Sequence, residues 1–436
     1  MKPSGHKGLT RLSPVLMAAA ALLCVLALAL FGGKKDAASA APSVSAPSAP
    51  ALPFPGGLRI AVASDTHLDP DNTDKSGDIS ETVYNMEIAD AMLWDAREQG
   101  AELLLITGDL CNSGKTGKHE ALVKKLRAAE EAGLTVFVLP GNHDLAPLRQ
   151  TEFAALYADF GYEEAFSRDP ASLSYCVLRD DLMLLLMDAA GYGVGAIDLP
   201  DAPTRRDSSA FLCERTLAWA EEMLREAHTR GLPVLAAGHF NLIPEISRTP
   251  GSGYYVENGV RFADLLRQYG VKLYLSGHMH LCAVYQEESL TEQLTGCLIA
   301  YPTAYTMLDL AEGDWRVSPR RTDVDAWAAA SGQDDPVLLH FADWQEKALY
   351  EYCRRSVEGM SARNPIPEAE KAPATEFFYT AMSAYWDGSL ALRRNSVRAM
   401  AGYEPFFHCA EGYSYGWWLK ELIETASPLL GGYTLG

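Results

Sequence analysis

The stretch LTVFVLPGNHDL, residues 134–145, decides the fold class that we expect for this chain. Its apolar residues 136–139 form a short run that is typical of a buried β-strand, and a Pro-Gly pair ends that run. Asn142, His143 and Asp144 follow at once. A buried strand that ends in three polar side chains indicates a functional site at its carboxyl end.

Four more apolar runs between residues 58 and 309 end in polar residues, and amphipathic stretches lie between them. This alternation of β and α patterns predicts an α/β fold. Open α/β sheets bind ligands outside the carboxyl ends of their strands, so side chains far apart in the sequence can converge there. The strand ends supply Asp65, His67, Asp109, Asn142, His143, Asp144, His239, His278 and His280.

These side chains have the chemistry of a metal site. Carboxylates, imidazoles and one amide oxygen, without a thiolate, suit divalent ions such as manganese, iron or zinc. The number of ligand positions exceeds what one ion takes, so we expect two ions and a bridging carboxylate. Asn112 follows Asp109 closely, and two interpretations stay open: it forms a turn, or it contacts a substrate phosphate.

The ordered motifs D-x-H, G-D, G-N-H-D, G-H and G-H-x-H resemble those of the calcineurin-like metallophosphoesterase superfamily. The resemblance implies a four-layer fold, an α+β sandwich in which helices flank two central β-sheets. It implies that His143 acts as a general acid or transition-state stabiliser and that Asp144 orients it. It also implies one metal ion on Asp65, His67, Asp109 and His280, and a second on Asp109, Asn142, His239 and His278.

The same resemblance implies a mechanism. Two cations lower the pKa of a shared water molecule, and the resulting hydroxide attacks phosphorus in line. The leaving oxygen then needs a proton, which His143 supplies.

A closer similarity concerns the substrate. The stretch GHFNLIP at residues 238–244 and the helical C-terminal appendage are similar to exported bacterial proteins grouped with class III cyclic nucleotide phosphodiesterases. This similarity implies hydrolysis of a small phosphodiester such as a cyclic nucleotide. In a departure from many such enzymes, Phe240 rather than a second histidine follows His239. Because loops select the substrate, three alternatives stay open: a phosphomonoesterase or nucleotidase, an envelope phosphate hydrolase, and a metal-containing cell-surface binding protein.

The chain divides into four expected parts. Residues 1–34 combine Lys2, Lys7 and Arg11 with an apolar run, which predicts export by a signal peptide or a retained membrane anchor. Residues 35–57 form a linker rich in Pro, Ala and Ser, and "ASA" at 38–40 offers a cleavage site. We expect the catalytic domain at 58–317 and a small helical domain at 318–436, whose aromatic residues, Trp417 among them, form packing contacts.

Charge and cysteine content exclude other classes of protein. A net charge of -20 repels polyanions, which excludes long nucleic acid as a partner. The 8 cysteines show no CxxC spacing, so we expect most of them to be small buried side chains. The expected location is outside the cytoplasmic membrane, in the cell envelope or secreted, and the sequence leaves the oligomeric state open.

Overall fold

The computed structural model describes residues 57–72, 83–179, 182–192, 194–202, 210–243, 255–311, 314–425 and 433–435. The expected export segment and all but the last residue of the expected linker lie outside this part of the chain. Among the described residues, every helix is too short or too polar to cross a bilayer.

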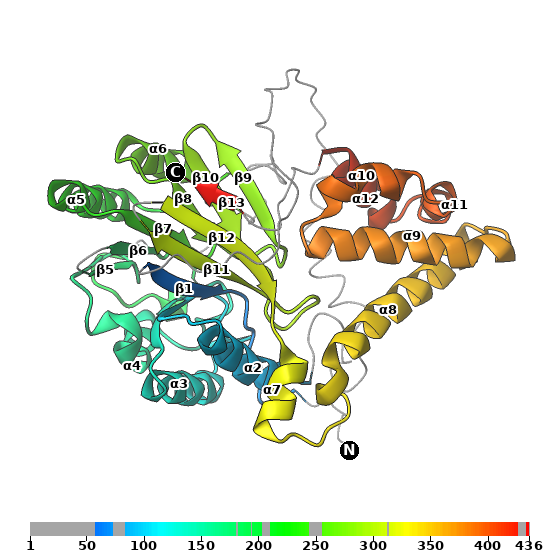
Figure 1. Cartoon of the computed structure of the whole chain (residues 1–436). Helices are drawn as coiled ribbons and strands as arrows, with labels where there is room; N and C mark the ends of the chain where they lie inside the picture. Colours follow the sequence, from blue (N-terminus) through cyan, green and yellow to red (C-terminus); the bar gives the residue numbers. More distant parts are fainter. Residues whose placement is uncertain are drawn as a thin grey trace, which may run out of the picture.

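Two β-sheets form the centre of the molecule (Figure 1). The first has the strand order β13-β12-β11-β1-β2-β3, and the second has the order β4-β5-β6-β7-β8-β10-β9. The strands of the first sheet are β1 (Leu58–Ala63), β2 (Leu103–Thr107), β3 (Thr135–Leu139), β11 (Ala304–Ala311), β12 (Asp314–Arg321) and β13 (Tyr433–Leu435). Those of the second are β4 (Ser167–Arg168), β5 (Tyr175–Leu178), β6 (Met183–Met187), β7 (Val234–Gly238), β8 (Leu273–Ser276), β9 (Ala283–Glu287) and β10 (Leu290–Leu294).

The sheets pack face to face, and helices cover their outer faces. In β6, Leu184 and Leu186 belong to the core shared with the first sheet, whereas Met183, Leu185 and Met187 belong to a second core. This division follows because successive side chains of a strand point to opposite faces. The helices of the first core are α2 (Asn85–Glu98), α3 (Thr116–Glu131) and α4 (Gln150–Leu156); those of the second are α5 (Glu214–Arg230) and α6 (Gly259–Gln268). The four layers confirm the predicted architecture.

Parallel pairing brings the functional strand ends to one edge. In the first sheet Val62 pairs with Leu105, and Leu105 pairs with Phe137, so β1, β2 and β3 run in the same direction. In the second sheet β6, β7 and β8 are also parallel. The polar residues that follow these strands therefore meet at the carboxyl edges of the two sheets.

The strand β10 was not predicted from the sequence. All five of its residues are buried, although Thr291, Glu292 and Gln293 in its middle are polar. It pairs in parallel with β8 and antiparallel with β9. The apolar signal that normally reveals a buried strand is absent here, because tertiary hydrogen bonds satisfy the polar side chains.

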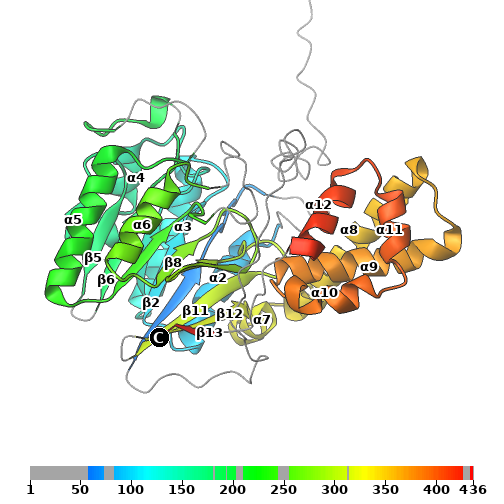
Figure 2. The ribbon, with the colours of Figure 1, turned by 90° about the horizontal axis from the view of Figure 1, so that it is seen from above.

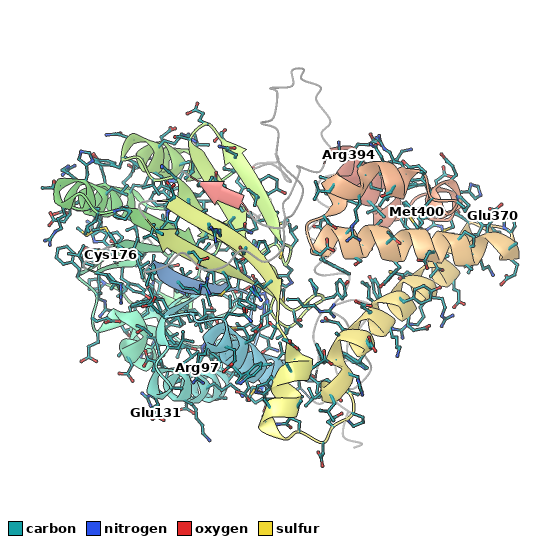
Figure 3. The ribbon with its side chains drawn as sticks, viewed as in Figure 1. Arg97, Glu131, Cys176, Glu370, Arg394 and Met400 are labelled. Atoms are coloured by element: carbon teal, nitrogen blue, oxygen red, sulfur yellow. The ribbon has the colours of Figure 1, made fainter. Side chains whose placement is uncertain are left out.

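The cysteines confirm the prediction of small buried side chains. Of the seven within the described residues, six are buried and all are free. Cys176 of β5 lies inside the molecule (Figure 3), where its Sγ is 3.3 Å from the Sδ of Met223 on α5. These residues contribute packing rather than a disulfide framework.

The C-terminal helices form a separate layer beside the sheets (Figure 2). Their core includes Phe377, Phe378 and Phe406, and the last two rings stack at 4.7 Å. Trp417 is an exception to the predicted packing, because 47% of its surface is exposed. The helices are α7 (Val324–Ser331), α8 (Phe341–Arg363), α9 (Glu368–Trp386), α10 (Leu390–Arg398), α11 (Tyr403–Cys409) and α12 (Ser414–Thr425), and short turns are η2 (Ala158–Tyr162), η3 (Val194–Ala196) and η4 (Leu338–His340).

The division between the catalytic and helical domains stays a prediction. The expected limit between residues 317 and 318 falls inside β12, which continues to Arg321. The strand β13 near the C-terminus pairs with β12, so the end of the chain returns to the first sheet. Backbone pairing, which has no local sequence signal in a three-residue strand, ties the two regions together.

Candidate metal centre

All seven expected metal ligands lie together at the carboxyl edges of the sheets. Asp65 and His67 follow β1, and Asp109 follows β2. The other four are Asn142 after β3, His239 after β7, and His278 and His280 after β8. Their ligand atoms form two clusters that share Asp109.

The first cluster surrounds one oxygen of Asp65. The Nε2 atoms of His67 and His280 are 3.1 Å apart, and Asp65 Oδ1 is 3.3 Å from His280 Nε2. Asp65 Oδ1 is fully buried without a hydrogen-bond partner. Asp109 Oδ2 lies 3.7 Å from His67 Nε2. A buried carboxylate oxygen without a donor, beside two imidazole nitrogens in contact, fits a cation at their centre.

The second cluster surrounds His239 Nε2. This atom is 3.2 Å from Asn142 Oδ1, 3.2 Å from His278 Nδ1 and 3.2 Å from Asp109 Oδ2. Since Asp109 Oδ2 also faces the first cluster, the carboxylate stands where a ligand common to two ions belongs.

Hydrogen bonds around the clusters aim the ligand atoms inward. His239 Nδ1 is 2.9 Å from the carbonyl oxygen of Thr107, an arrangement in which Nδ1–H donates and Nε2 stays available. Asp65 Oδ2 accepts from Ser64 Oγ at 2.6 Å and from the His278 N–H at 2.9 Å. Asp109 Oδ1 accepts from the His143 N–H at 2.8 Å. Each carboxylate thus has one oxygen held by the protein and one directed at the clusters.

The electrostatics favour cation binding. Burial opposes ionisation of Asp109, yet the nearby His239 and His67 hold its pKa well below the usual range. Burial lowers the pKa of His67 to about 3 and that of His278 to about 4, so both rings are neutral near pH 7. Neutral imidazole and ionised carboxylate are the states in which these groups bind metal.

The pKa values of two other histidines are raised by the carboxylates that they face. Burial lowers the pKa of His239, but the Asp109 carboxylate outweighs this effect and raises it to about 9. Burial also opposes protonation of His280, and Asp65 raises its pKa. Metal binding releases such protons, because a bound cation takes over their charge.

The backbone of the site is strained. Asp65, His67, Asp109, His278 and His280 all have positive φ angles, of 51°, 37°, 49°, 66° and 56°. Side chains with a Cβ rarely adopt this region, and it costs about 1–3 kcal/mol per residue. Because all five of these residues also supply candidate ligand atoms, the tertiary structure holds the loops in a backbone geometry that local sequence preferences disfavour.

Two glycines let these loops approach one another. A Cβ on Gly141 would lie 2.3 Å from Asp109 Oδ1 and 2.4 Å from the Asp109 nitrogen. A Cβ on Gly277 would lie 2.6 Å from Asp65 Oδ2. The G-N-H-D and G-H-x-H motifs therefore need glycine because a ligand carboxylate fills the space beside the backbone.

Asp144, the expected orienting partner of His143, has other hydrogen-bond partners in the structure. The Asp144 carboxylate accepts hydrogen bonds from the backbone N–H groups of Leu110, Cys111 and Gly141, at 3.1, 3.0 and 2.7 Å. It therefore ties the loop after β2 to the loop after β3. Burial raises its pKa to about 7. Its neighbours in the sequence gave no sign of this role, since all three donors are backbone groups.

His143 has a different partner. Its Nδ1 lies 3.3 Å from the backbone oxygen of Asn112, and its Nε2 lies 4.0 Å from Asp109 Oδ2. The side chain is 47% exposed, whereas that of Asp109 is 2% exposed. His143 is consequently the histidine beside the clusters that an incoming substrate meets first.

A buried lysine holds Asn112, the residue that His143 contacts. The sequence did not predict this role. Lys118 of α3 places Nζ 2.6 Å from Asp69 Oδ1 and 2.6 Å from Asn112 Oδ1. Asn112 Nδ2 in turn donates to Asp69 Oδ2 at 2.5 Å. The amide of Asn112 is thus bonded to protein groups, and the residue fixes the loop on which His143 rests. A lysine on an amphipathic helix carries no sequence signal for such a contact.

Cys297 also lies beside the first cluster, near His67 and His280. Its thiol donates to the backbone oxygen of Asp65 at 3.1 Å. Burial raises the pKa of Cys297 well above its usual value, so the thiol stays neutral. Its hydrogen bond to the Asp65 backbone directs the thiol to the protein, which leaves carboxylate, imidazole and amide groups as the expected donor set.

The comparisons with known proteins define the class of this protein. Residues 58–282 match the family described as calcineurin-like phosphoesterase, and residues 323–425 match the C-terminal domain of cyclic nucleotide phosphodiesterase. The first match covers more than half of the chain. The chain therefore belongs to the calcineurin-like phosphoesterase family, and it is a metal-dependent phosphoester hydrolase.

Solved structures with a similar backbone include three phosphoesterases. A dimetal phosphatase from Danio rerio has 13% identity and a TM-score of 0.47, with 61% of this chain and 96% of that chain covered. A purple acid phosphatase from yellow lupin has 12% identity and a TM-score of 0.41, with 61% and 52% covered. A putative 5'-nucleotidase from Staphylococcus aureus has 13% identity and a TM-score of 0.39, with 59% and 51% covered. No curated protein sequence matches the chain significantly.

Proposed function

We propose that this hydrolase cleaves phosphodiesters, cyclic nucleotides among them, with two divalent ions of manganese, iron or zinc. The observation that carries the proposal is the presence, in one chain, of the paired ligand clusters and of a C-terminal region that matches cyclic nucleotide phosphodiesterases. The donor set of oxygen and imidazole nitrogen suits these metals.

The metal clusters, Asp109 and His143 have separate roles in the proposed reaction. Two ions bound at the clusters would lower the pKa of water and neutralise phosphate oxygens, which permits in-line attack near neutral pH. Asp109 holds the two clusters at a fixed separation through Oδ2. His143 rests on the Asn112 carbonyl through Nδ1 and presents Nε2 on the exposed side of the clusters. From Nε2 it donates a proton to the leaving oxygen.

The test of diester specificity uses the full chain, stripped of metal and refilled with manganese. We expect turnover of bis(p-nitrophenyl) phosphate and of 3′,5′-cyclic AMP to exceed turnover of p-nitrophenyl phosphate, with two ions per chain by elemental analysis. Faster cleavage of the monoester would instead favour a phosphomonoesterase or nucleotidase. Two bound ions without turnover of any of these esters would favour a cell-surface binding protein.

The role of His143 has a separate test. Nitrophenolate leaves readily without a proton, whereas the alkoxide of a cyclic nucleotide needs one. His143→Ala should therefore lower kcat for 3′,5′-cyclic AMP by about 10²–10⁴-fold and that for bis(p-nitrophenyl) phosphate much less. His228→Ala, a change at an exposed histidine of α5, is the matched control and should leave both rates unchanged. Equal losses on both substrates would exclude proton donation by His143.

We also propose that the enzyme acts outside the cytoplasmic membrane. The basic residues and the apolar run within residues 1–34 support export. Fractionation of cells that produce the full chain, followed by mass spectrometry of its N-terminus, tests this location. An N-terminus near residue 41 would indicate cleavage, an intact Met1 in the membrane fraction would indicate an anchor, and recovery in the cytoplasm would refute export.

A further inference from the structure

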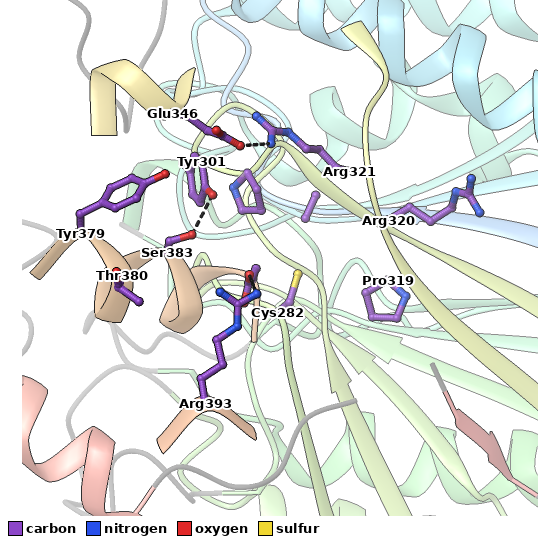
Figure 4. A pocket seen from close by; sticks show the side chains of 13 residues that line it. Cys282, Tyr301, Pro319, Arg320, Arg321, Glu346, Tyr379, Thr380, Ser383 and Arg393 are labelled. Carbon is purple, nitrogen blue, oxygen red and sulfur yellow. Dashed lines mark hydrogen bonds and ion pairs between the residues drawn. The ribbon is translucent and has the colours of Figure 1, made fainter. Parts of the chain in front are cut away.

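A cavity of about 490 Å³ lies between the first sheet and the C-terminal helices (Figure 4). Its walls come from the end of β12, from the loop before β11 and from helices α8, α9 and α10. None of the seven candidate metal ligands lines it. Pockets of 300–1,000 Å³ are typical of small-molecule sites, so this cavity has the size of a second ligand site.

Two guanidinium groups line the cavity of an otherwise acidic protein. Arg321 and Arg393 meet the two carboxylates of Glu346 and Asp387 at the cavity, whereas the Arg320 side chain points away from it (Figure 4). The chain as a whole carries a net charge of -20. The planar donors of a guanidinium group match the oxygens of a phosphate group.

The arginines approach the cavity from different elements. Arg321 Nη1 is 3.3 Å from Glu346 Oε1, and the Arg321 guanidinium lies 5.6 Å from the centre of the Tyr301 ring. Arg393 of α10 is half exposed, and its nearest carboxylate oxygen, on Asp387, is 3.8 Å away. This separation exceeds a hydrogen bond, so Arg393 retains donor capacity for a ligand.

Two tyrosines add flat apolar surfaces. Tyr301 is buried, and its hydroxyl is 2.8 Å from Ser383 Oγ on α9. Tyr379, also on α9, directs its side chain toward the cavity (Figure 4). Aromatic rings beside guanidinium groups suit a ligand with a planar ring, because rings stack and the cation lies over the π face.

The cavity wall continues into the metal centre. Cys282 lines the cavity two residues after His280, and its N–H donates to the Trp386 oxygen of α9 at 3.3 Å. On the other side, the segment that leads to Tyr301 begins at Leu298, whose N–H donates to the Ser64 oxygen beside Asp65 at 3.1 Å. A ligand in the cavity therefore touches the segment that carries His280 and a second segment that is hydrogen-bonded to Ser64 beside Asp65.

We propose that this cavity is a second ligand site, which binds a small phosphate monoester with a planar ring, the chemistry of a nucleoside monophosphate. The inference is independent of diester specificity, because it rests on residues outside the metal centre. Arg393, which retains donor capacity, holds the phosphate, and Tyr379 contacts the ring.

Equilibrium dialysis of the metal-loaded full chain against 5′-AMP and inorganic phosphate tests the proposal. The metal centre also binds phosphate, so we compare the stoichiometry of Asp109→Ala, Arg393→Gln and Tyr379→Ala with that of the unaltered chain. We expect AMP to bind at a site that Asp109→Ala retains and that Arg393→Gln weakens at least roughly tenfold, the effect of one charge-assisted hydrogen bond. Tyr379→Ala should weaken AMP more than phosphate.

The matched control is Arg398→Gln, the same change on the same helix at a residue that pairs with Glu424 away from the cavity. It should leave AMP binding unchanged. A single AMP per chain that is lost in Asp109→Ala and kept in Arg393→Gln would overturn the proposal. Equal affinity for AMP and phosphate would overturn the part assigned to the tyrosine rings.

Discussion

The Lys118→Met variant tests how the protein positions His143. In the structure the Lys118 ammonium joins Asp69 to Asn112, and the backbone oxygen of Asn112 faces His143 Nδ1. Methionine keeps the length of the side chain but removes the charge and both contacts. The loop that carries Asn112 then loses one of its anchors, while the hydrogen bond from Asn112 to Asp69 and every expected metal ligand stay in place.

The expected fall in kcat follows from the burial of the Lys118 contacts. The Lys118 side chain is 8% exposed, so solvent screens its charge little. Hydrogen bonds to charged groups contribute about 1.5–3 kcal/mol, a factor of about 10–100 in rate if the whole loss falls on the transition state. Because His143 keeps a backbone partner, we expect the lower end: about a tenfold fall in kcat for 3′,5′-cyclic AMP.

Steady-state kinetics and elemental analysis check this expectation. KM and the metal content should change little, and bis(p-nitrophenyl) phosphate should be less affected than the cyclic nucleotide. Lys125→Met is the matched control, since Lys125 lies on the same helix and pairs with Asp90 instead. If the two variants retain equal kcat, or if Lys118→Met loses metal, the positioning argument fails.

Three further predictions follow from the geometry. Gly141→Ala should abolish activity and lower metal content, since the added Cβ would lie 2.3 Å from Asp109 Oδ1. Gly117→Ala is the control, because the space around its added Cβ is open; it should keep activity and stabilise α3 by about 0.5–1 kcal/mol. Burial raises the pKa of Glu292 to about 7, so the folded state binds its proton more tightly than the unfolded state. Its contribution to stability is therefore complete below about pH 4.5 and is lost as pH rises through 7, by about 3 kcal/mol. The free energy of unfolding of Glu292→Gln in urea should lack this part of the pH dependence. A pH profile equal to that of the unaltered chain would contradict a raised pKa of Glu292. Tyr301→Phe should lower the melting temperature by only a few degrees, because one hydrogen bond to Ser383 contributes about 1 kcal/mol; a larger drop in calorimetry would show that the hydroxyl has other partners.

The sequence by itself determined the class of fold and the membership of the site. Each of the five strands that carry the site is an apolar run in the sequence, and each run ends in residues whose chemistry is that of metal ligands, as at Asn142 and His143. Parallel strands bring such ends to one edge of a sheet whatever the lengths of the connections. The motifs at the strand ends were therefore enough to predict that Asp65 lies near His280.

Only the tertiary structure decided how these groups are held. The strand β10 is polar in sequence and is buried because Glu292 receives hydrogen bonds from Ser276 and from the backbone N–H groups of Leu242 and Ile243. Asp144 binds three backbone N–H groups and not His143. The contact of Lys118 with Asn112 and the cavity beneath the C-terminal helices join segments that share no local pattern. Propensity and periodicity report what a residue does within its own strand or helix, whereas these contacts arise between elements, where packing and the satisfaction of buried polar groups decide the partner.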